Sequence, residues 1–287
     1  MNKEIWTIGR ILQWTEQYFH NKELDTPRLD GEVLLSHVLG KDRIYLYIHY
    51  DQPLTTEELS AYKALVLKRV NGYSVASIVG HKEFMGLSFM VNEDVLIPRP
   101  DTETLVEYTI ESCKQKTDLS VLDVCTGPGT ILLSLLHYLP QATGIGLDLS
   151  EKALDVAKQN RKALQLEERA TLIQSNMFTS LKKEKLFDII VSNPPYISTG
   201  EMDTLPSEVL HEPHMALDGG EDGLDFYRIL VSESHYYLQL GGLLIIEIGT
   251  HQEEAIIQLF ASAPQYKCID TVRDLANVIR VLVFQKV

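Results

Sequence analysis

The sequence predicts an α/β fold in which a small helical bundle precedes a larger domain built on a mostly parallel sheet. Apolar residues recur at helical spacing through residues 1–75, and strand-like apolar runs alternate with helical segments from Leu119 onward. The 287 residues suffice for two unequal domains. Apolar residues make up 45% of the chain and charged residues 23%, which excludes disordered, collagen-like and coiled-coil proteins.

The first segment, residues 1–75, is predicted to be a helical bundle. Residues three or four positions apart form two successive apolar faces, namely Ile5, Ile8 and Leu12, then Leu29, Val33, Leu34 and Val38. Pro27 suits the first position of a helix. Thr55 and Glu58 have the spacing of a capping box, and the helix that they begin should end at Asn71.

A hairpin linker is predicted over residues 76–96, where Val, Ile and Phe are frequent and Gly86 interrupts them. The turn that follows holds two prolines and leads into a helix, for which Asp101 or Thr102 can serve as the N-cap. The larger domain therefore spans 97–287.

The larger domain alternates strands with helices. Strands are predicted over 119–124, 143–147, 170–174, 187–191, 243–248, 266–271 and 278–284. Helices are predicted over 101–115, 129–138, 151–163, 224–238 and 252–262. This order indicates a parallel sheet with helices on both faces, and the short turn between the last two strands indicates that one of them runs antiparallel.

The charge balance argues against a nucleic-acid partner. The net charge is −14, and residues 1–80 hold 9 basic and 10 acidic residues, so the acidic excess lies in the larger domain. Proteins that bind by neutralising phosphates need a large basic surface, so we expect no direct contact with nucleic acid. Solubility alone also accounts for the acidic excess.

Cysteine usage and hydropathy favour a cytoplasmic protein. Cys113, Cys125 and Cys268 form no C-x-x-C pair, so a reducing compartment fits. The first residues mix charged and apolar side chains, unlike a signal peptide. Apolar runs such as Leu243–Ile246 are too short to span a membrane, so we expect no membrane partner.

The first chemical motif is the strand and turn of residues 121–130. Glycines let the backbone approach a ligand closely, and the helix that follows offers free N–H groups at its start. The candidate cofactor-binding residues of this turn are Cys125, Thr126, Gly127, Pro128 and Gly129. A purely structural turn remains the alternative interpretation of this motif taken alone.

Asp148 supplies the second motif. It ends the next strand, about twenty residues past the turn, where an acidic residue can accept both hydroxyls of a ribose. The pair of motifs indicates a cofactor that contains adenosine. A dinucleotide site prefers G-x-G-x-x-G, whereas Leu132 replaces the third glycine and Pro128 lies inside the loop, which favours S-adenosylmethionine.

The third motif, Asn193-Pro194-Pro195-Tyr196, follows a buried strand and should face the cofactor. The Asn193 side-chain oxygen and the Pro194 carbonyl can each accept a hydrogen bond from a substrate NH2 group. The prolines hold this loop in place, and Tyr196 offers an aromatic face to a planar group. Two such acceptors would aim the nitrogen lone pair at a methyl group, so catalysis would come from positioning and electrostatics, with no general base.

Several stretches together resemble the release factor glutamine methyltransferase family over nearly the whole chain. They are Leu96–Glu103 with its Pro-Arg-Pro segment, Asn193–Ile197, Glu212-Pro213, Ala216-Leu217, Gly219–Leu224, Tyr227-Arg228 and Glu247–Gly249. The Pro-Arg-Pro segment is the most discriminating, because nucleic-acid methyltransferases with the same tetrapeptide do not usually carry it. The resemblance implies a Rossmann-like, seven-stranded class I methyltransferase domain behind a helical substrate-recognition domain.

The resemblance also implies substrate, cofactor and site. The substrate is the glutamine of the Gly-Gly-Gln motif of bacterial class I peptide chain release factors, and the methyl donor is S-adenosyl-L-methionine, which leaves as S-adenosyl-L-homocysteine. The implied catalytic residues are Asn193, Pro194 and Tyr196, and the implied substrate-binding residues are these with Pro195. The implied cofactor-binding residues are Cys125, Thr126, Gly127, Pro128, Gly129, Asp148, Met177 and Asn193. We expect a monomer.

Five positions depart from the family pattern, and two of them, Pro128 and Thr130, replace the commoner small residues of the turn. Cys125 stands where the first glycine of the turn is usual, and we expect it to keep an allowed conformation without a positive φ. Asn176 replaces a common acidic residue expected near the adenine amino group, beside Met177, which would pack on the adenine. Asn277 replaces a common glycine, and Asn tolerates a left-handed turn.

Other features receive simpler interpretations. His211 and His214 lack a third ligand, so no metal is expected. The long segment 197–223 should help to wall the substrate site. Arg99, Pro100 and Glu103 are further candidates to line it, although helix capping explains Glu103 almost as well.

Three alternatives remain open on the sequence. A DNA or RNA amino-methyltransferase acting on adenine N6 or guanine N2 could use the same tetrapeptide, but it would need basic phosphate contacts and a base-flipping pocket. A non-catalytic cofactor-binding module is suggested by Cys125 and Asn176 and opposed by the intact Asn193 loop. A nicotinamide dehydrogenase has the wrong loop pattern.

Overall fold

The computed structural model describes residues 5–114, 116–183 and 186–287, and the chain divides into two compact units. The first unit comprises the residues up to Gly80 together with the distant segment Pro206–His211. The second unit comprises His81–Leu205 and Glu212–Val287. Residues 1–4 of the predicted bundle lie outside the described residues.

The first unit is helical, as the sequence predicts. Its helices are α1 (Ile8–His20), α2 (Pro27–Leu39), α3 (Arg43–Ile48), α4 (Thr56–Val70), α5 (Val75–Val79) and α9 (Ser207–Leu210). Pro27 begins α2, and Thr55 and Glu58 form the predicted capping box of α4, which ends at Val70 with Asn71 as its C-cap. Ile5 was expected on an apolar helical face, but it precedes α1 and is 66% exposed.

The buried side chains of this unit come from several helices and include Ile8, Leu12, Phe19, Leu34, Leu35, Tyr62 and Val66. Arg69 lies at their edge with only 4% of its side chain exposed. Its guanidinium pairs with Asp30 of α2 and with Glu208 of α9, each at 2.6 Å. Tyr73 stacks on His211 at 4.0 Å between ring centroids, so α9 packs as part of this unit.

The predicted hairpin is present, but it begins later than expected. Strands β1 (His81–Phe84) and β2 (Leu87–Met90) pair antiparallel around a turn at Gly86, whose φ is +69°. The start of the predicted linker instead forms α5, because the Ser74 hydroxyl accepts from the Ser77 N–H and caps a short helix.

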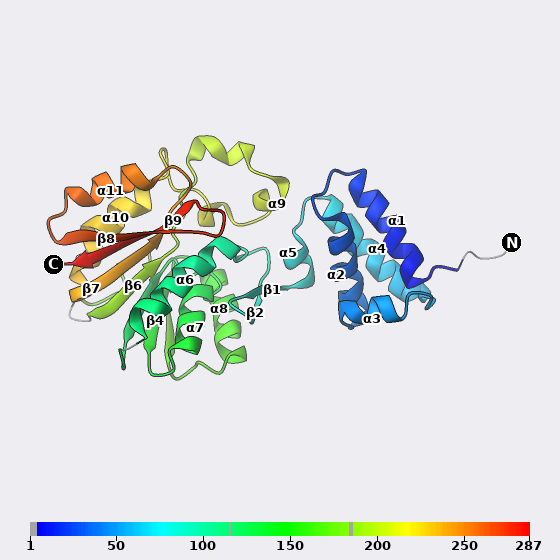
Figure 1. Cartoon of the computed structure of the whole chain (residues 1–287), viewed down its shortest axis with the longest axis horizontal. Helices are drawn as coiled ribbons and strands as arrows, with labels where there is room; N and C mark the ends of the chain where they lie inside the picture. The colour runs from blue at the N-terminus through cyan, green and yellow to red at the C-terminus, as the bar shows by residue number, and fades with distance from the viewer. Residues whose placement is uncertain (1–4, 115, 184–185) are drawn as a thin grey trace. The chain divides into compact units, whose positions relative to one another are not determined.

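The second unit is organised around a seven-stranded sheet with the order β5-β4-β3-β6-β7-β9-β8 (Figure 1). The strands are β3 (Ser120–Val124), β4 (Thr143–Asp148), β5 (Ala170–Gln174), β6 (Phe187–Ser192), β7 (Leu238–Glu247), β8 (Tyr266–Arg273) and β9 (Ile279–Lys286). All neighbouring pairs from β5 to β7 are parallel, and β9 runs antiparallel to both of its neighbours. The predicted antiparallel strand at the end of the chain is confirmed.

Helices cover both faces of this sheet (Figure 1). On one face lie α6 (Pro100–Cys113), α7 (Thr130–Tyr138) and α8 (Glu151–Ala163), and on the other lie α10 (Asp225–Glu233) and α11 (Glu253–Ala261). Because strand side chains alternate between faces, neighbouring residues enter different cores. Val121, Ile189 and Ile245 pack under α6 and α7, whereas Leu122, Ile190 and Leu244 pack under α10 and α11.

Most predicted elements of this unit agree with the structure to within a few residues, but three need correction. The strand predicted from residue 243 begins at Leu238, as β7. The α6 helix begins at Pro100 with Arg99 as its N-cap, so neither Asp101 nor Thr102 caps it. Pro100 has no N–H to satisfy, which suits the first helical position. The helix predicted over 224–238 ends at Glu233 and continues as a short 3₁₀ turn. Residue 115, the predicted end of α6, lies outside the described residues.

No helix in the described part of the chain is both long enough and apolar enough to cross a bilayer. All three cysteines are free thiols.

Candidate active site

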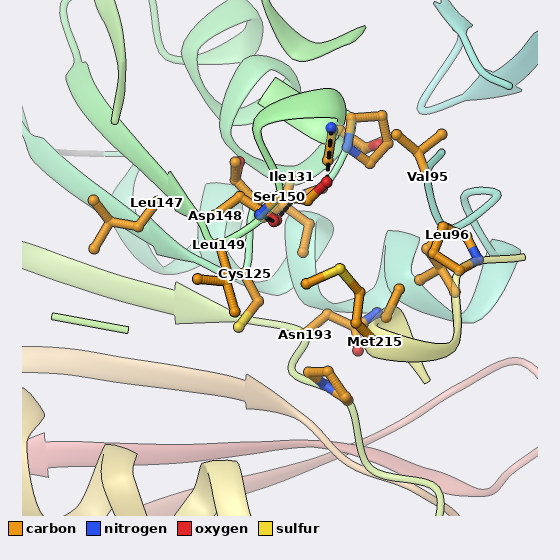
Figure 2. A pocket seen from close by; sticks show the side chains of 18 of the residues that line it. Val95, Leu96, Cys125, Ile131, Leu147, Asp148, Leu149, Ser150, Asn193 and Met215 are labelled. Carbon is orange, nitrogen blue, oxygen red and sulfur yellow. Dashed lines mark hydrogen bonds between the residues drawn. The ribbon is translucent and has the colours of Figure 1, made fainter. Parts of the chain in front are cut away.

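A pocket of about 400 Å³ opens in the second unit at the carboxyl ends of β3, β4 and β6. Parallel strands of an open α/β sheet place ligands at this edge. Figure 2 shows Asn193, Met215, Cys125, Asp148 and Ser150 around this space, with Val95 and Leu96 at another side of it. The lining also includes Pro98, Arg99, Thr102, Thr126, Gly127, Pro128, Asn176, Met177, Pro195 and Phe226.

The turn between β3 and α7 forms one wall of this pocket. Three of its residues take positive φ values, namely Cys125 at 64°, Gly127 at 54° and Gly129 at 82°. The expectation that Cys125 would avoid a positive φ is therefore wrong. The left-handed conformation costs a residue with a Cβ about 1–2 kcal/mol, and the surrounding fold sustains it here. Cys125 Sγ lies 3.8 Å from Met177 Sδ.

Asp148 binds this turn to the end of β4. Its Oδ2 accepts from the Gly127 N–H at 2.7 Å, and its Oδ1 accepts from the Ser150 N–H at 2.9 Å. Burial raises the pKa of Asp148, although these backbone hydrogen bonds oppose the rise. A carboxylate has further lone pairs, so Asp148 can still accept hydroxyl groups of a ligand. A Cβ added at Gly127 would meet no atom within 4 Å, so the turn is open to a ligand there.

Asp123 also supports the turn, and the sequence analysis missed it. It is fully buried in β3 and accepts from the Thr126 hydroxyl at 2.6 Å and from the Leu132 N–H at 3.2 Å. Burial raises the pKa of Asp123 to about 7. The sequence does point to Asp123, because it lies between apolar residues of a strand. Burying a carboxylate there costs free energy unless hydrogen bonds compensate for it.

Met177 and Asn176 line the side of the pocket near β5. Met177 has a φ of +48° and is 6% exposed, and its carbonyl accepts from the Ser175 hydroxyl at 2.7 Å. Both side chains line the pocket beside the Cys125 turn, where an adenine ring could pack.

The tetrapeptide begins directly after β6. Asn193 lines the pocket, and its Nδ2 donates to the Thr102 hydroxyl at 3.3 Å. Pro195 also lines the pocket, whereas Pro194 and Tyr196 are absent from the set of lining residues. Burial raises the pKa of Tyr196 to about 12, so its phenol stays neutral.

Glycines hold the second half of the tetrapeptide against the following loop. A Cβ at Gly219 would lie 2.8 Å from the Pro195 oxygen, and one at Gly223 would overlap the Tyr196 carbonyl oxygen. That carbonyl also accepts from the Gln252 amide at 2.9 Å. The close approach requires glycine at both positions, which explains this part of the motif.

Glu212, in the long segment 197–223, contacts the Pro-Arg-Pro segment. Its Oε1 lies 2.6 Å from the Arg99 guanidinium, and its Oε2 accepts from the Ile97 N–H at 3.0 Å. Arg99 itself lines the pocket. Glu103 does not, because its Oε1 accepts from the Met85 N–H at 2.7 Å in the hairpin turn.

The two histidines have protein partners of their own. His211 Nε2 lies 2.9 Å from the Asn71 carbonyl oxygen, and His214 Nδ1 lies 3.8 Å from Asp218 Oδ2. Within the described residues, no three His, Cys, Asp or Glu side chains form a group that could hold a metal ion.

Comparison with known proteins covers both units. Residues 10–80 match the family model described as the PrmC N-terminal domain, and residues 115–276 match a methyltransferase domain. A release factor glutamine methyltransferase from Geobacter sulfurreducens is 41% identical over 280 residues, covering 97% of this chain and 96% of the relative. One from Rhodopirellula baltica is 40% identical over 290 residues, covering 99% and 98%.

Solved structures resemble the fold at low sequence identity. The catalytic domain of hMettl16 in complex with the MAT2A 3′UTR hairpin 6 has a TM-score of 0.56 at 15% identity, covering 82% of this chain and 84% of that one. A methyltransferase from Pyrococcus furiosus has a TM-score of 0.54 at 18% identity, covering 79% and 98%. At these identities the similarity shows the class I methyltransferase fold alone.

Proposed function

The chain belongs to the release factor glutamine methyltransferase family, and from that premise we propose that it methylates the glutamine of the Gly-Gly-Gln motif in bacterial class I release factors. The acceptor is the side-chain amide nitrogen. The placement of Asn193 carries the proposal. Its side-chain amide lines the pocket at the end of β6, and its Nδ2 donates a hydrogen bond to the Thr102 hydroxyl. Its oxygen is then the atom available to a substrate NH2 group.

S-adenosylmethionine fits the pocket as the methyl donor. When bound, it supplies an electrophilic methyl group on a sulfonium. The Cys125–Gly129 turn would approach it closely, Asp148 would accept its ribose hydroxyls, and Met177 and Asn176 would contact its adenine. The open side of Gly127 and the remaining acceptor capacity of Asp148 support this assignment.

The tetrapeptide would position the acceptor nitrogen. A glutamine amide nitrogen is a poor nucleophile, because its lone pair is delocalised into the carbonyl group. Asn193 Oδ1 and the Pro194 carbonyl would each accept one N–H, which aims the lone pair and favours the developing positive charge. Tyr196, which does not line the pocket, would support this loop as a neutral phenol.

We place this activity in the cytoplasm, in a monomeric enzyme without nucleic-acid or membrane partners. The three free thiols suit a reducing compartment, and the net charge of −14 disfavours phosphate binding. The partner would be the release factor itself, and the helical first unit would help to recognise it.

The direct test is transfer of a labelled methyl group from S-adenosylmethionine to a purified bacterial class I release factor. The matched control is the same factor with the Gly-Gly-Gln glutamine changed to alanine. Label on the first protein and none on the second supports both the substrate and the acceptor residue. Label on naked DNA or RNA, with none on the release factor, would replace this proposal with nucleic-acid methylation. Cofactor binding without any transfer would favour a non-catalytic module.

A further inference from the structure

A buried carboxylate lies next to Asn193 and has no role in the site as described so far. Glu247 is the last residue of β7, the strand parallel to β6. Ser192 pairs with Ile246 in this register, and Asn193 and Glu247 are the residues that follow these two along the chain. Only 2% of Glu247 is exposed.

The direction of the Glu247 side chain follows from strand alternation. Ile246 packs under α10 and α11, so the side chain of Glu247 points to the opposite face, which α6 covers. From α6, Thr102 lies in the first turn, is 5% exposed and influences the pKa of Glu247. Burial raises the pKa of Glu247 to about 7, although Thr102, the charge of Arg280 and, least of these, Asn193 act to lower it.

The fold does not account for this carboxylate. Glu247 Oε2 is buried and has no hydrogen-bond partner among the described residues. The preceding residues of β7, Leu243–Ile246, are all apolar, and an apolar side chain at 247 would avoid the cost of burying a charge. A costly group beside a site residue suggests a functional reason for keeping it.

We propose that Glu247 is a positioning residue for methyl transfer: with the Thr102 hydroxyl, it holds the Asn193 side chain with its NH2 inward and its oxygen toward the substrate amide. This inference rests on the proposed function. An asparagine side chain has two ends of nearly equal size, one that donates and one that accepts. An ionised carboxylate only accepts hydrogen bonds, so the ionised form of Glu247 selects the NH2 end.

The Thr102 hydroxyl completes the arrangement. It accepts from Asn193 Nδ2 at 3.3 Å and can donate its own hydrogen to the carboxylate. Reversing the amide would set its oxygen against the carboxylate and its NH2 group against the N–H groups of a substrate. Both contacts are repulsive. Glu247 therefore favours the orientation in which the Asn193 oxygen points to the substrate, although Glu247 does not contact the substrate itself.

The kinetic test compares Glu247→Gln with Glu254→Gln, the same chemical change at an exposed position of α11. Gln can present its own NH2 group and so permits the reversed amide. We expect Glu247→Gln to lower kcat by about 10- to 100-fold, because small misplacements of a reacting group have effects of this size. The Kd for S-adenosylmethionine should change less than about twofold, and Glu254→Gln should match the parent enzyme. An unchanged kcat in Glu247→Gln would overturn the proposal.

A matched pair at Thr102 tests the hydroxyl. Thr102→Val keeps the shape and removes the hydrogen bonds, whereas Thr102→Ser keeps the hydroxyl. Thr102→Val should lower kcat by a factor similar to that of Glu247→Gln, and Thr102→Ser should lose far less. Equal losses in both variants would point to packing and contradict the proposal.

A readout without substrate separates this inference from the proposed function. The side-chain NH2 signals of Asn193, assigned by their loss in Asn193→Asp, are followed by NMR in the full-length protein. They should exchange slowly with solvent in the parent and at least about tenfold faster in Glu247→Ala, since an amide without its acceptor is less protected. If the NH2 signals are protected but the protein does not methylate a release factor, the proposed function is refuted, whereas the contact between Glu247 and Asn193 is supported. Equal exchange in both proteins would refute the contact itself.

Discussion

Oδ2 of Asp148 accepts a hydrogen bond of 2.7 Å from the backbone N–H of Gly127, although the two residues lie 21 positions apart. This bond connects the turn after β3, which is expected to approach the cofactor closely, to the end of β4, which is expected to hold its ribose. We expect Asp148→Ala to weaken S-adenosylmethionine binding by at least about tenfold, since hydrogen bonds to a charged group contribute about 1.5–3 kcal/mol. Isothermal titration calorimetry measures the change, and an unaltered Kd would contradict the assignment.

Asn193→Ala should separate catalysis from cofactor binding. Loss of the acceptor should reduce kcat by about 100-fold or more, a typical effect of removing one electrostatic stabiliser of a transition state. The Kd for S-adenosylmethionine should stay close to that of the parent enzyme. Methyl transfer to the release factor and cofactor titration are measured on the same preparation. Equal losses in both would mean that Asn193 mainly shapes the cofactor site.

The positive φ of Cys125 predicts an unusual order of substitutions. Cys125→Gly should be tolerated, because glycine takes the left-handed conformation without cost. Cys125→Val should lower the free energy of unfolding by at least about 1 kcal/mol, because a β-branched side chain is most restricted there. Urea denaturation of the three proteins gives the comparison. A Val variant as stable as the Gly variant would show that this turn is not strained.

The two carboxylates that share Arg69 should contribute unequally to stability. Asp30 has 6% of its side chain exposed and Glu208 has 39%. Asp30→Asn weakens a buried ion pair and should destabilise the first unit by about 3 kcal/mol, whereas Glu208→Gln should cost about 1 kcal/mol or less. Thermal unfolding followed by circular dichroism distinguishes them. Similar losses in the two variants would mean that burial does not set the strength of these pairs.

Buried carboxylates should make the second unit less stable as pH rises. Burial raises the pKa of Asp123 and of Glu247 to about 7, from ordinary values of 3.8 and 4.5. The folded state then holds more protons than the unfolded chain between those values, so the free energy of unfolding falls as pH rises through this window. Each group contributes a slope of up to about 1.4 kcal/mol per pH unit.

Glu247→Gln removes one of these groups and should flatten the dependence between about pH 5 and about pH 8. The variant should also be more stable than the parent at the upper end of that range, because it no longer ionises in the interior. Urea denaturation at a series of pH values supplies the curves, with Glu254→Gln as the control. Parallel curves for Glu247→Gln and the parent would rule out Glu247 as their source.

Local patterns in the sequence determined most of the architecture. The 3.6-residue and two-residue periods of apolar side chains mark helices and strands within a few positions, because each element needs an apolar face to bury. The strand–turn–helix around Gly127 and the tetrapeptide after β6 were equally visible, since their chemistry lies in contiguous residues. The carboxyl-edge rule for parallel strands was then enough to bring Asp148 and Asn193 to one pocket.

Tertiary structure decided what depends on contacts between distant segments. Asn193 meets Thr102 across 91 positions, and Ile97 meets Glu212 across 115. The register of β6 on β7 brings Glu247 to the site, and the packing of α9 gives Pro206–His211 to the helical unit. Such contacts follow from strand order and packing, which a local period does not encode. The positive φ of Cys125 has the same origin, because the surrounding contacts, and not the residue's own preference, hold it there.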